Sequence, residues 1–169
     1  MKKRSTLYLA QSGAITALYV VLTLVFAPIS FGAVQVRVAE ALTILPLFTS
    51  AAIPGLFLGC VLANLLGGGI VLDVVFGSLA TLLGAVFGYV LRKNRWLVPV
   101  PAIVFNTLIV PPVLRYGYGV ELPLLLLALY IAIGEVLGCG LLGQLLASLL
   151  LKRGDRIFRK ADDENTPKE

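Results

Sequence analysis

The stretch LPLLLLALYIAIGEVLGCGLLGQLLASLLL, residues 122–151, decides the fold class of this chain. A helix needs about twenty apolar residues to cross the hydrocarbon core of a bilayer. This run exceeds that length and holds a single charged side chain, Glu135. A soluble domain of this size could not bury so much apolar surface, because small domains leave much of their chain exposed. The segment therefore predicts a transmembrane helix with a carboxylate in its interior.

The composition of the whole chain supports the same conclusion. Of its 169 residues, 59% are hydrophobic and 14% are charged, whereas soluble domains carry about a quarter charged residues. These values exclude a soluble enzyme and an intrinsically disordered chain. Histidine is absent, which excludes mechanisms that need a histidine base or a histidine metal ligand. Cys60 and Cys139 lie in apolar runs, and we interpret both as small buried hydrophobes, in neither a disulfide nor a metal site.

Further apolar segments precede that long run. Pro46, Ser50 and Pro54 interrupt the region between 41 and 66, so we predict two short helices there instead of one. The predicted helices cover residues 7–27, 41–49, 53–66, 72–91, 97–114 and 122–151. We therefore expect an all-α membrane protein, a six-helix bundle formed by residues 1–151. A basic and polar tail, 152–169, follows it, and we expect its end to be disordered.

The lysines and arginines predict the orientation of this bundle. Of 14 such residues, twelve lie at the N-terminus, between the fourth and fifth helices, or after the sixth. Loops rich in lysine and arginine face the cytoplasm, so we expect both termini inside and only Arg37 and Arg115 outside. The net charge of +5 then reflects membrane topology, and we expect no binding to nucleic acid.

Polar side chains inside lipid are costly, so each one marks either a binding site or a packing contact. Glu135 lies near the middle of the sixth helix, and Asn106 lies at a similar depth in the fifth. For both we weigh ligand binding against a hydrogen bond between helices. Asn64 lies near the outer end of the third helix. Asp73 lies at the start of the fourth helix, where we expect it to act as a helix cap.

The loop after the first helix places Gln35, Arg37 and Glu40 between apolar residues. Arg37 and Glu40 have the i, i+3 spacing of an exposed ion pair. In the alternative interpretation, this loop folds over an outward-facing cavity and closes it. Polar groups from the loop and from several helices would then converge in the outer half of the bundle.

A stripe of small residues follows one side of the first helix at positions i, i+3, i+4 and i+7: Ala10, Gly13, Ala14 and Ala17. Such stripes let helix backbones approach closely in a membrane. From these residues alone, we slightly favour packing within this chain over docking of another membrane subunit. The sequence has no GxxxxGK[ST] loop, no large cytoplasmic segment and no obvious inverted repeat. Uptake against a gradient would therefore need energy from partner proteins.

Three segments resemble the QueT family: QVRVAEALTILP (35–46), AIPGLFLGCVLANL (52–65) and DVVFGSLATL (73–82). Members of this family are substrate-binding S components of energy-coupling-factor (ECF) transporters and are associated with uptake of queuosine precursors. The resemblance covers about residues 7–151. It implies a six-helix S component in the bacterial cell membrane, working with a transmembrane coupling subunit and two cytoplasmic ATPases. Because ATP would be used by those partners, no cofactor is expected in this chain.

The resemblance also implies roles for individual residues. In such transporters an alanine-rich motif on the first helix contacts the coupling subunit, and residues 10–14 match it, which favours docking for the stripe. The implied ligand is a 7-deazaguanine, either a base or a nucleoside. One carboxylate can accept hydrogen bonds from both the ring N–H and the exocyclic amine of such a base. Glu135 is our first choice for that carboxylate and Glu40 is the second.

Other polar and aromatic residues complete the expected site. Asn106 and Asn64 would bind the carbonyl and the ring edge, whereas Gln35 and Arg37 would belong to the closing loop. Phe31 or Tyr19 would stack on the ring. Alternative functions are an S component for riboflavin, thiamine or folate, and a structural partner protein that binds no ligand. A membrane-embedded enzyme is disfavoured, because the sequence has no histidine and no clustered pair of acids.

Overall fold

A computed structural model of the chain describes residues 2–30 and 36–153. These residues form α-helices joined by 3₁₀ and π segments, and the described part contains no strand, which confirms the all-α prediction. The elements are α1 (Lys2–Val25), α2 (Ala27–Ser30), η1 (Val38–Leu47), α3 (Ala52–Leu66), η2 (Asp73–Gly77), α4 (Ser78–Val90), α5 (Val100–Pro112), η3 (Val113–Gly117), α6 (Leu124–Glu135), η4 (Val136–Leu142) and α7 (Gly143–Arg153).

Four helical stretches among the described residues are long and apolar enough to cross a bilayer. They are Thr6–Val25, Asp73–Val90, Val100–Gly117 and Leu124–Lys152, and each lies within three residues of a predicted helix. Two further apolar helices, η1 and α3, are shorter. With 15 residues, α3 spans about 22 Å, less than the roughly 30 Å of the hydrocarbon core. The described residues therefore contain four helices of spanning length, which fits a membrane protein, where we predicted six spans.

The predicted helix at 41–49 differs from what forms there. The structure has a 3₁₀ helix of ten residues that begins earlier, at Val38, and ends at Leu47. Runs of 3₁₀ helix longer than three or four residues are uncommon. Residues 39–46 are all buried, and η1 contacts α1, α3, α4, η4 and α7. Packing from all sides explains how this geometry persists, and it makes η1 the centre of the bundle.

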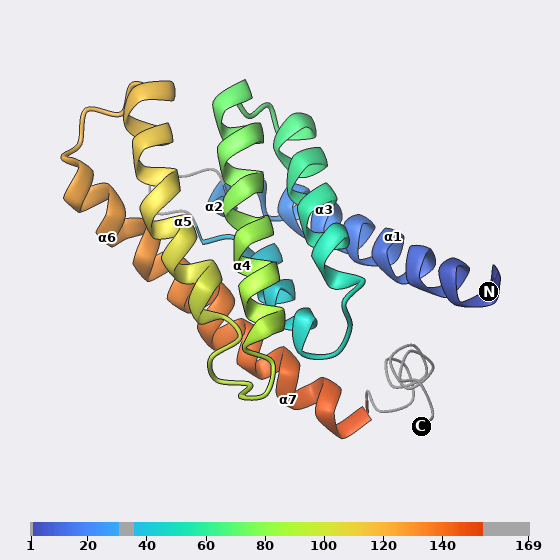
Figure 1. The fold of residues 1–169 in the computed structure, drawn as a ribbon. Helices are drawn as coiled ribbons and strands as arrows, with labels where there is room; N and C mark the ends of the chain where they lie inside the picture. Colours follow the sequence, from blue (N-terminus) through green and yellow to red (C-terminus); the bar gives the residue numbers. More distant parts are fainter. Residues whose placement is uncertain (1, 31–35, 154–169) are drawn as a thin grey trace.

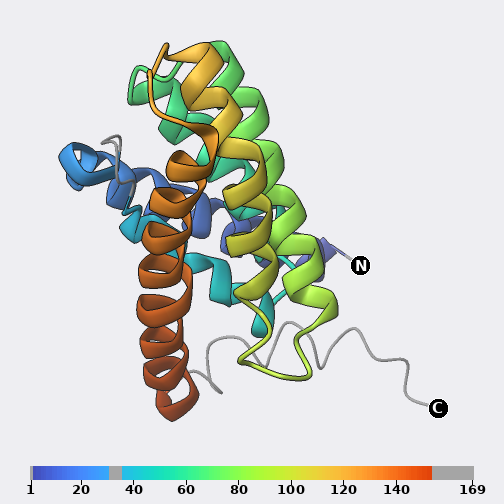
Figure 2. The ribbon, with the colours of Figure 1, turned by 90° about the vertical axis from the view of Figure 1, so that its left-hand side faces the viewer.

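The arrangement around η1 is visible in two views. The helices α3, α4 and α5 run side by side, and α6, η4 and α7 form one long rod against them (Figures 1 and 2). The helix α1 crosses this group at a steep angle, and its first turns project from the bundle (Figure 1). The basic loop 91–99 and the end of α7 lie at one end of the bundle, and the loops after α3 and η3 lie at the other.

Glycines allow the helices to approach each other closely. A Cβ atom at Gly59 of α3 would lie 2.7 Å from the Cβ of Tyr19 in α1. One turn earlier, a Cβ at Gly55 would lie 2.9 Å from the Cβ of Ile15. In α4, a Cβ at Gly84 would lie 2.8 Å from the Cα of Ala102 in α5. Close backbone approach through small residues is how helices associate in membranes, where lipid tails are as apolar as leucine.

We expect Gly59→Leu to destabilise the protein, because the new side chain would overlap Tyr19 and separate α1 from α3. Overpacking of this kind costs about 1–3 kcal/mol. Thermal unfolding of the purified protein in detergent measures the effect. The control is Gly13→Leu on α1, since a Cβ there has nothing within 4 Å. Equal unfolding temperatures for the two variants would contradict the proposed role of Gly59.

Candidate ligand-binding site

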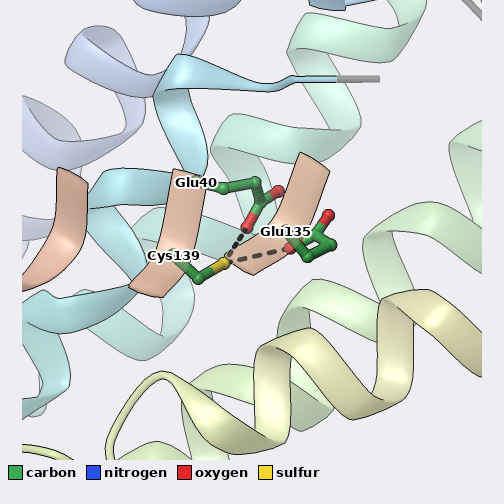
Figure 3. Close-up of side chains that lie close together, drawn as sticks. All are labelled: Glu40, Glu135 and Cys139. Atoms are coloured by element: carbon green, nitrogen blue, oxygen red, sulfur yellow. Dashed lines mark hydrogen bonds between the residues drawn. The ribbon is translucent and has the colours of Figure 1, made fainter. Parts of the chain in front are cut away.

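Two carboxylates from distant parts of the sequence meet beside η1. Both Glu40 and Glu135 are buried, with 1% and 5% of their surface exposed. The Sγ atom of Cys139 lies 3.0 Å from Oε2 of Glu135 and 3.9 Å from Oε2 of Glu40 (Figure 3). The inference that the chain has no clustered pair of acids is therefore wrong. Residues 40 and 135 are remote in sequence, and only the packing of η1 on η4 brings them together.

The other oxygen of Glu40 is bound by Tyr19. The hydroxyl of this fully buried tyrosine donates a hydrogen bond to Oε1 of Glu40. Tyr19 reaches this position because Gly59 lets α1 lie close to α3. We predicted Tyr19 as an aromatic that stacks on the ligand, and that role stays a prediction. Phe31, the other stacking candidate, lies outside the described residues.

An ion pair forms the outer part of the same cluster. Nη2 of Arg37 lies 3.6 Å from Oδ2 of Asp73, and both side chains are buried. We predicted Asp73 as a helix cap, and this is wrong: the helix has already begun at residue 71, and Leu72 occupies the cap position of η2. Asp73 is thus free to pair with Arg37, a partner that spacing along the chain did not indicate.

Tyr118 connects this ion pair to the surface. Its hydroxyl donates to Oδ2 of Asp73 at 3.2 Å and accepts a hydrogen bond from the backbone N–H of Ile70 at 3.3 Å. Partial burial, followed by the charge of Asp73, raises the pKa of the Tyr118 phenol, so the hydroxyl keeps the proton that it donates. With 41% of its surface exposed, Tyr118 is the accessible member of the cluster. The sequence analysis did not include Tyr118 among the site residues.

Several buried polar atoms of the cluster have no hydrogen-bond partner among the described residues. Asn64 donates from Nδ2 to the backbone oxygen of Asp73 at 3.2 Å, but its Oδ1 accepts no bond. Oδ1 of Asp73 and Nδ2 of Asn106 are also without partners. The side-chain amide of Asn106 lies close enough to the carboxylate of Glu135 to interact with it. An unpaired buried polar group costs about 1–3 kcal/mol, so these atoms are available to a ligand that supplies the missing bonds.

Departures from α-helical geometry coincide with the acidic residues. Glu40 lies on the 3₁₀ helix η1, Asp73 begins the π segment η2, and Glu135 directly precedes the π segment η4. Such π segments occur frequently at functional sites. Within η4, a Cβ at Gly138 would lie 2.9 Å from the backbone oxygen of Arg37. Gly138 therefore allows η1 to approach the sixth helix closely enough for Cys139 to lie beside Glu40.

The described residues include one group with the ligand types of a metal site. The ligand atoms of Glu40, Glu135 and Cys139 all lie within 4.8 Å of one another. The same carboxylates could instead accept hydrogen bonds from an organic ligand. In either case Cys139 is buried and forms no disulfide, as we predicted, but it is not only a hydrophobe, because its thiol contacts both acids. Its spacing of four residues from Glu135, on the same helix face, was the sequence signal for this contact.

The structure thus brings together most residues that we predicted for the binding site. Glu135, Asn106, Asn64, Glu40 and Arg37 are all buried around η1. Gln35 lies outside the described residues. The role of these residues in binding stays a prediction. The burial of Arg37 and Glu40 contradicts the interpretation that these two residues form an exposed ion pair in a loop.

The small-residue stripe on α1 lies apart from this cluster. Ala10, Gly13, Ala14 and Ala17 are all exposed, whereas Ser12, Ile15 and Tyr19 face the bundle. The interpretation that the stripe packs within this chain is therefore wrong for the described residues. The stripe therefore lies on the outside of the bundle.

Comparisons with known proteins agree with the family that the three sequence segments suggested. Residues 9–152 match the model of the QueT transporter family. The chain belongs to the QueT transporter family. A curated relative, "Queuosine precursor transporter QueT" of Lactococcus lactis subsp. cremoris (strain MG1363), is 36% identical over 93 residues, which are 54% of this chain and 54% of the relative. The match thus spans about half the length of that relative. No solved structure matches the chain.

Family membership decides two of our predictions. The QueT family is a family of transporters, so the resemblance is confirmed, and the prediction that the chain is no enzyme follows from it. The long apolar helices fit a multi-pass membrane protein. For a transporter, a buried polar cluster with unpaired hydrogen-bonding atoms is the natural place to hold a small molecule.

We expect Arg37→Met to destabilise this QueT-family protein strongly in the absence of ligand. The substitution leaves buried carboxylates without their cation, and breaking a buried ion pair in this way costs about 3–5 kcal/mol. Thermal unfolding in detergent measures the change. Arg92→Met is the control, because Arg92 is exposed at the other end of the bundle. If both arginines could be replaced at equal cost, the ion pair with Asp73 would have no structural importance.

Proposed function

We propose that this chain is the substrate-binding S component of an ATP-driven ECF importer. It captures a queuosine precursor, a 7-deazaguanine base or nucleoside, at the outer face and delivers it inward. The single observation that carries this proposal is the cluster of Glu40, Glu135 and Asn106 buried inside an apolar bundle, in which Nδ2 of Asn106 has no hydrogen-bond partner among the described residues. Its membership in the QueT family and its relative's name supply the substrate class.

Glu135 is the better of the two candidates for the ring donors. Both oxygens of Glu40 have neighbours, since Oε1 accepts from Tyr19 and Oε2 lies near Cys139. Glu135 accepts a hydrogen bond from Cys139 through Oε2. A carboxylate has about four acceptor sites, so Glu135 can accept the N–H and the exocyclic amine of a guanine-like edge. Asn106 beside it can donate to the ring carbonyl.

The ligand would reach this cluster from the end of the bundle that carries Tyr118. Tyr118 is half-exposed and is hydrogen bonded to Asp73. In the proposed topology both termini and the basic loop 91–99 face the cytoplasm, so the end with Tyr118 faces outward. Arg37 and its neighbours in the segment 36–40 then cover the site on that side.

The stripe on α1 is the proposed contact surface for the transmembrane coupling subunit. The four small residues are exposed on the bundle, and small residues allow close approach of a second helix within the membrane. ATP would be hydrolysed by two cytoplasmic ATPases attached to that subunit. In this arrangement the present chain holds no cofactor and supplies only specificity.

Mass spectrometry of the small molecules that co-purify with the protein tests the proposed function. We expect a 7-deazaguanine or its nucleoside to be released on denaturation. Riboflavin, thiamine or folate would indicate an S component for a different vitamin. A protein that yields no ligand, and that binds no 7-deazaguanine in titration, would indicate a structural partner protein.

We expect Glu135→Gln to weaken binding of a 7-deazaguanine by about 1.5–3 kcal/mol, the value of a hydrogen bond to a charged group. Glutamine keeps the shape of the side chain but cannot accept two donors with the same strength. Titration of the purified variant measures the loss. Glu121→Gln, at an exposed position, is the matched control. Unchanged affinity in Glu135→Gln would remove this residue from the site.

We expect replacement of Ala10 and Ala14 by leucine to abolish uptake while ligand binding stays normal. Larger side chains would hold a partner helix away from α1. The measurements are uptake by cells that contain the complete transporter and titration of the isolated chain. Leu9→Phe changes a neighbouring exposed residue outside the stripe and serves as the control. Normal uptake by the double variant would exclude the stripe as the docking surface.

A further inference from the structure

A groove on the outside of the bundle lies between α5 and the rod formed by η4 and α7. Its volume is about 550 Å³, within the range of about 300–1,000 Å³ that is usual for sites of small ligands. Its walls are mainly apolar: Ile103 comes from α5, and Val136, Leu141 and Leu145 come from the rod. These three residues of the rod are 52%, 64% and 58% exposed. Because the helices on both sides belong to stretches of membrane-spanning length, the groove opens toward lipid.

The size of these side chains favours an acyl chain over a partner helix as the occupant. Helices that pack closely in membranes meet through small residues, and large leucines in the walls would hold a second helix away. Gly140 opens the floor of the groove. A Cβ there would lie 3.8 Å from Cγ1 of Val136 and 3.9 Å from Cδ1 of Ile103, so this position is not crowded. A thin, flexible hydrocarbon chain fits between the leucines and over this glycine.

The length of the groove matches one leaflet of a bilayer. Along the rod, the lining residues run from Val136 to Ser148. At 1.5 Å per residue this is about 18 Å, and half of the hydrocarbon core is about 15 Å. Trp96 lines the groove from the loop 91–99, at the same end of the bundle as the end of α7 (Figure 1), and is 60% exposed. Tryptophan is enriched at the membrane surface, so the groove runs from that surface toward the middle of the membrane.

Positive charge lies at the end of the groove that carries Trp96. The guanidinium carbon of Arg95 lies 4.7 Å from the centre of the Trp96 ring. Nε2 of Gln144 donates a hydrogen bond of 2.7 Å to the backbone oxygen of Arg95, which joins the loop to α7. Lys152 is exposed and follows Ser148 by four residues, so both lie on the same face of α7. Arg95 and Lys152 thus place two cations at this end of the groove.

The two segments that carry these cations contain no acidic residue to balance them. The loop 91–99 and α7 together have five lysines and arginines and no aspartate or glutamate. An apolar groove with a basic end at the membrane surface fits a molecule that combines a hydrocarbon chain with an anionic headgroup. Anionic lipids bind in basic pockets of this kind between transmembrane helices.

We propose that this groove binds one anionic phospholipid, with an acyl chain along Leu141 and Leu145 and the phosphate held by Arg95 and Lys152. The groove is separate from the buried polar cluster, so this inference goes beyond the proposed function. Gln144 holds the backbone of Arg95 at the end of the groove. In the proposed topology, the bound lipid belongs to the cytoplasmic leaflet.

Quenching of tryptophan fluorescence tests this inference, because Trp96 is the single tryptophan of the chain and lines the groove. The full chain in micelles of a neutral detergent is titrated with phosphatidylglycerol or with phosphatidylcholine. Both lipids carry the same brominated acyl chains, and bromine quenches an indole only at close range. We expect half-maximal quenching at an about five- to tenfold lower fraction of the anionic lipid.

Two pairs of variants separate the headgroup from the acyl chain. Arg95→Gln should remove the preference for phosphatidylglycerol. Its matched control is Arg92→Gln, which removes the same charge from the same loop and should keep most of the preference, since the Arg92 guanidinium lies 4.2 Å from the ring centre of Tyr89. Gly140→Leu fills the groove and should weaken quenching by both lipids. Gly13→Leu on α1, where a Cβ has nothing within 4 Å, should leave the quenching unchanged.

Three results would overturn the inference. Equal quenching by the two lipids in the unaltered chain would mean that the groove holds only the surrounding lipid. An equal loss of preference in the two arginine variants would assign the effect to the charge of the whole loop. Quenching by neither lipid would mean that a protein segment covers the groove. Because the groove lies apart from Glu40 and Glu135, each of these results leaves the proposed function standing.

Discussion

A charged side chain inside a lipid-facing bundle requires polar partners from the protein itself, and the 3₁₀ segment η1 is where this chain provides them. Arg37 and Glu40, at the start of η1, bring one positive and one negative charge to the centre of the helices. Asp73 pairs with the first, and Tyr19 with the second. Each partner comes from a different helix, so the polar cluster joins α1, η1 and η2.

Glycine determines how closely these partners can approach. Hydrophobic burial drives little association between helices in lipid, so close packing and polar contacts must do so. Because Gly59 has no side chain, the backbone of α1 lies close enough to α3 for Tyr19 to reach Glu40. Because Gly138 has none, the backbone carbonyl of Arg37 can pack directly against η4. A side chain at either glycine would separate the elements that carry the cluster. The glycines and the buried acids therefore form one structural unit.

The sequence was sufficient to predict those features of the fold that depend on a local pattern of residues. The four long helices follow from apolar length alone, and the burial of Glu135 and Asn106 follows from their positions within those helices. The geometry of η1 could not be predicted, because neither Pro46 nor the apolar run distinguishes a 3₁₀ helix from an α-helix. Its form depends on packing against five other elements.

Contacts between residues that are remote in sequence could not be predicted from a local pattern either. The positive-inside rule placed Arg37 on the outer side of the membrane. Its burial is explained only by the ion pair with Asp73, which lies on another helix. The contact between the regions of Glu40 and Glu135 depends on Gly138. The sequence shows that residue 138 is a glycine, but it does not show that the backbone of Arg37 packs against it. Moreover, π segments at 73–77 and 136–142 interrupt the 3.6-residue period. Helix faces extrapolated across them therefore drift away from the real ones.

The first helix has a buried side and an exposed side that carry different residues. At about 100° per residue, positions 10, 13, 14 and 17 centre on one side of α1. Positions 12, 15, 19 and 23 centre on the opposite side, and they are the buried ones. The buried side reaches the polar cluster through Tyr19, whereas the stripe faces outward. Because none of these residues belongs to both sides, a substitution that changes the packing of Tyr19 against Glu40 leaves the side chains of the exposed stripe unchanged.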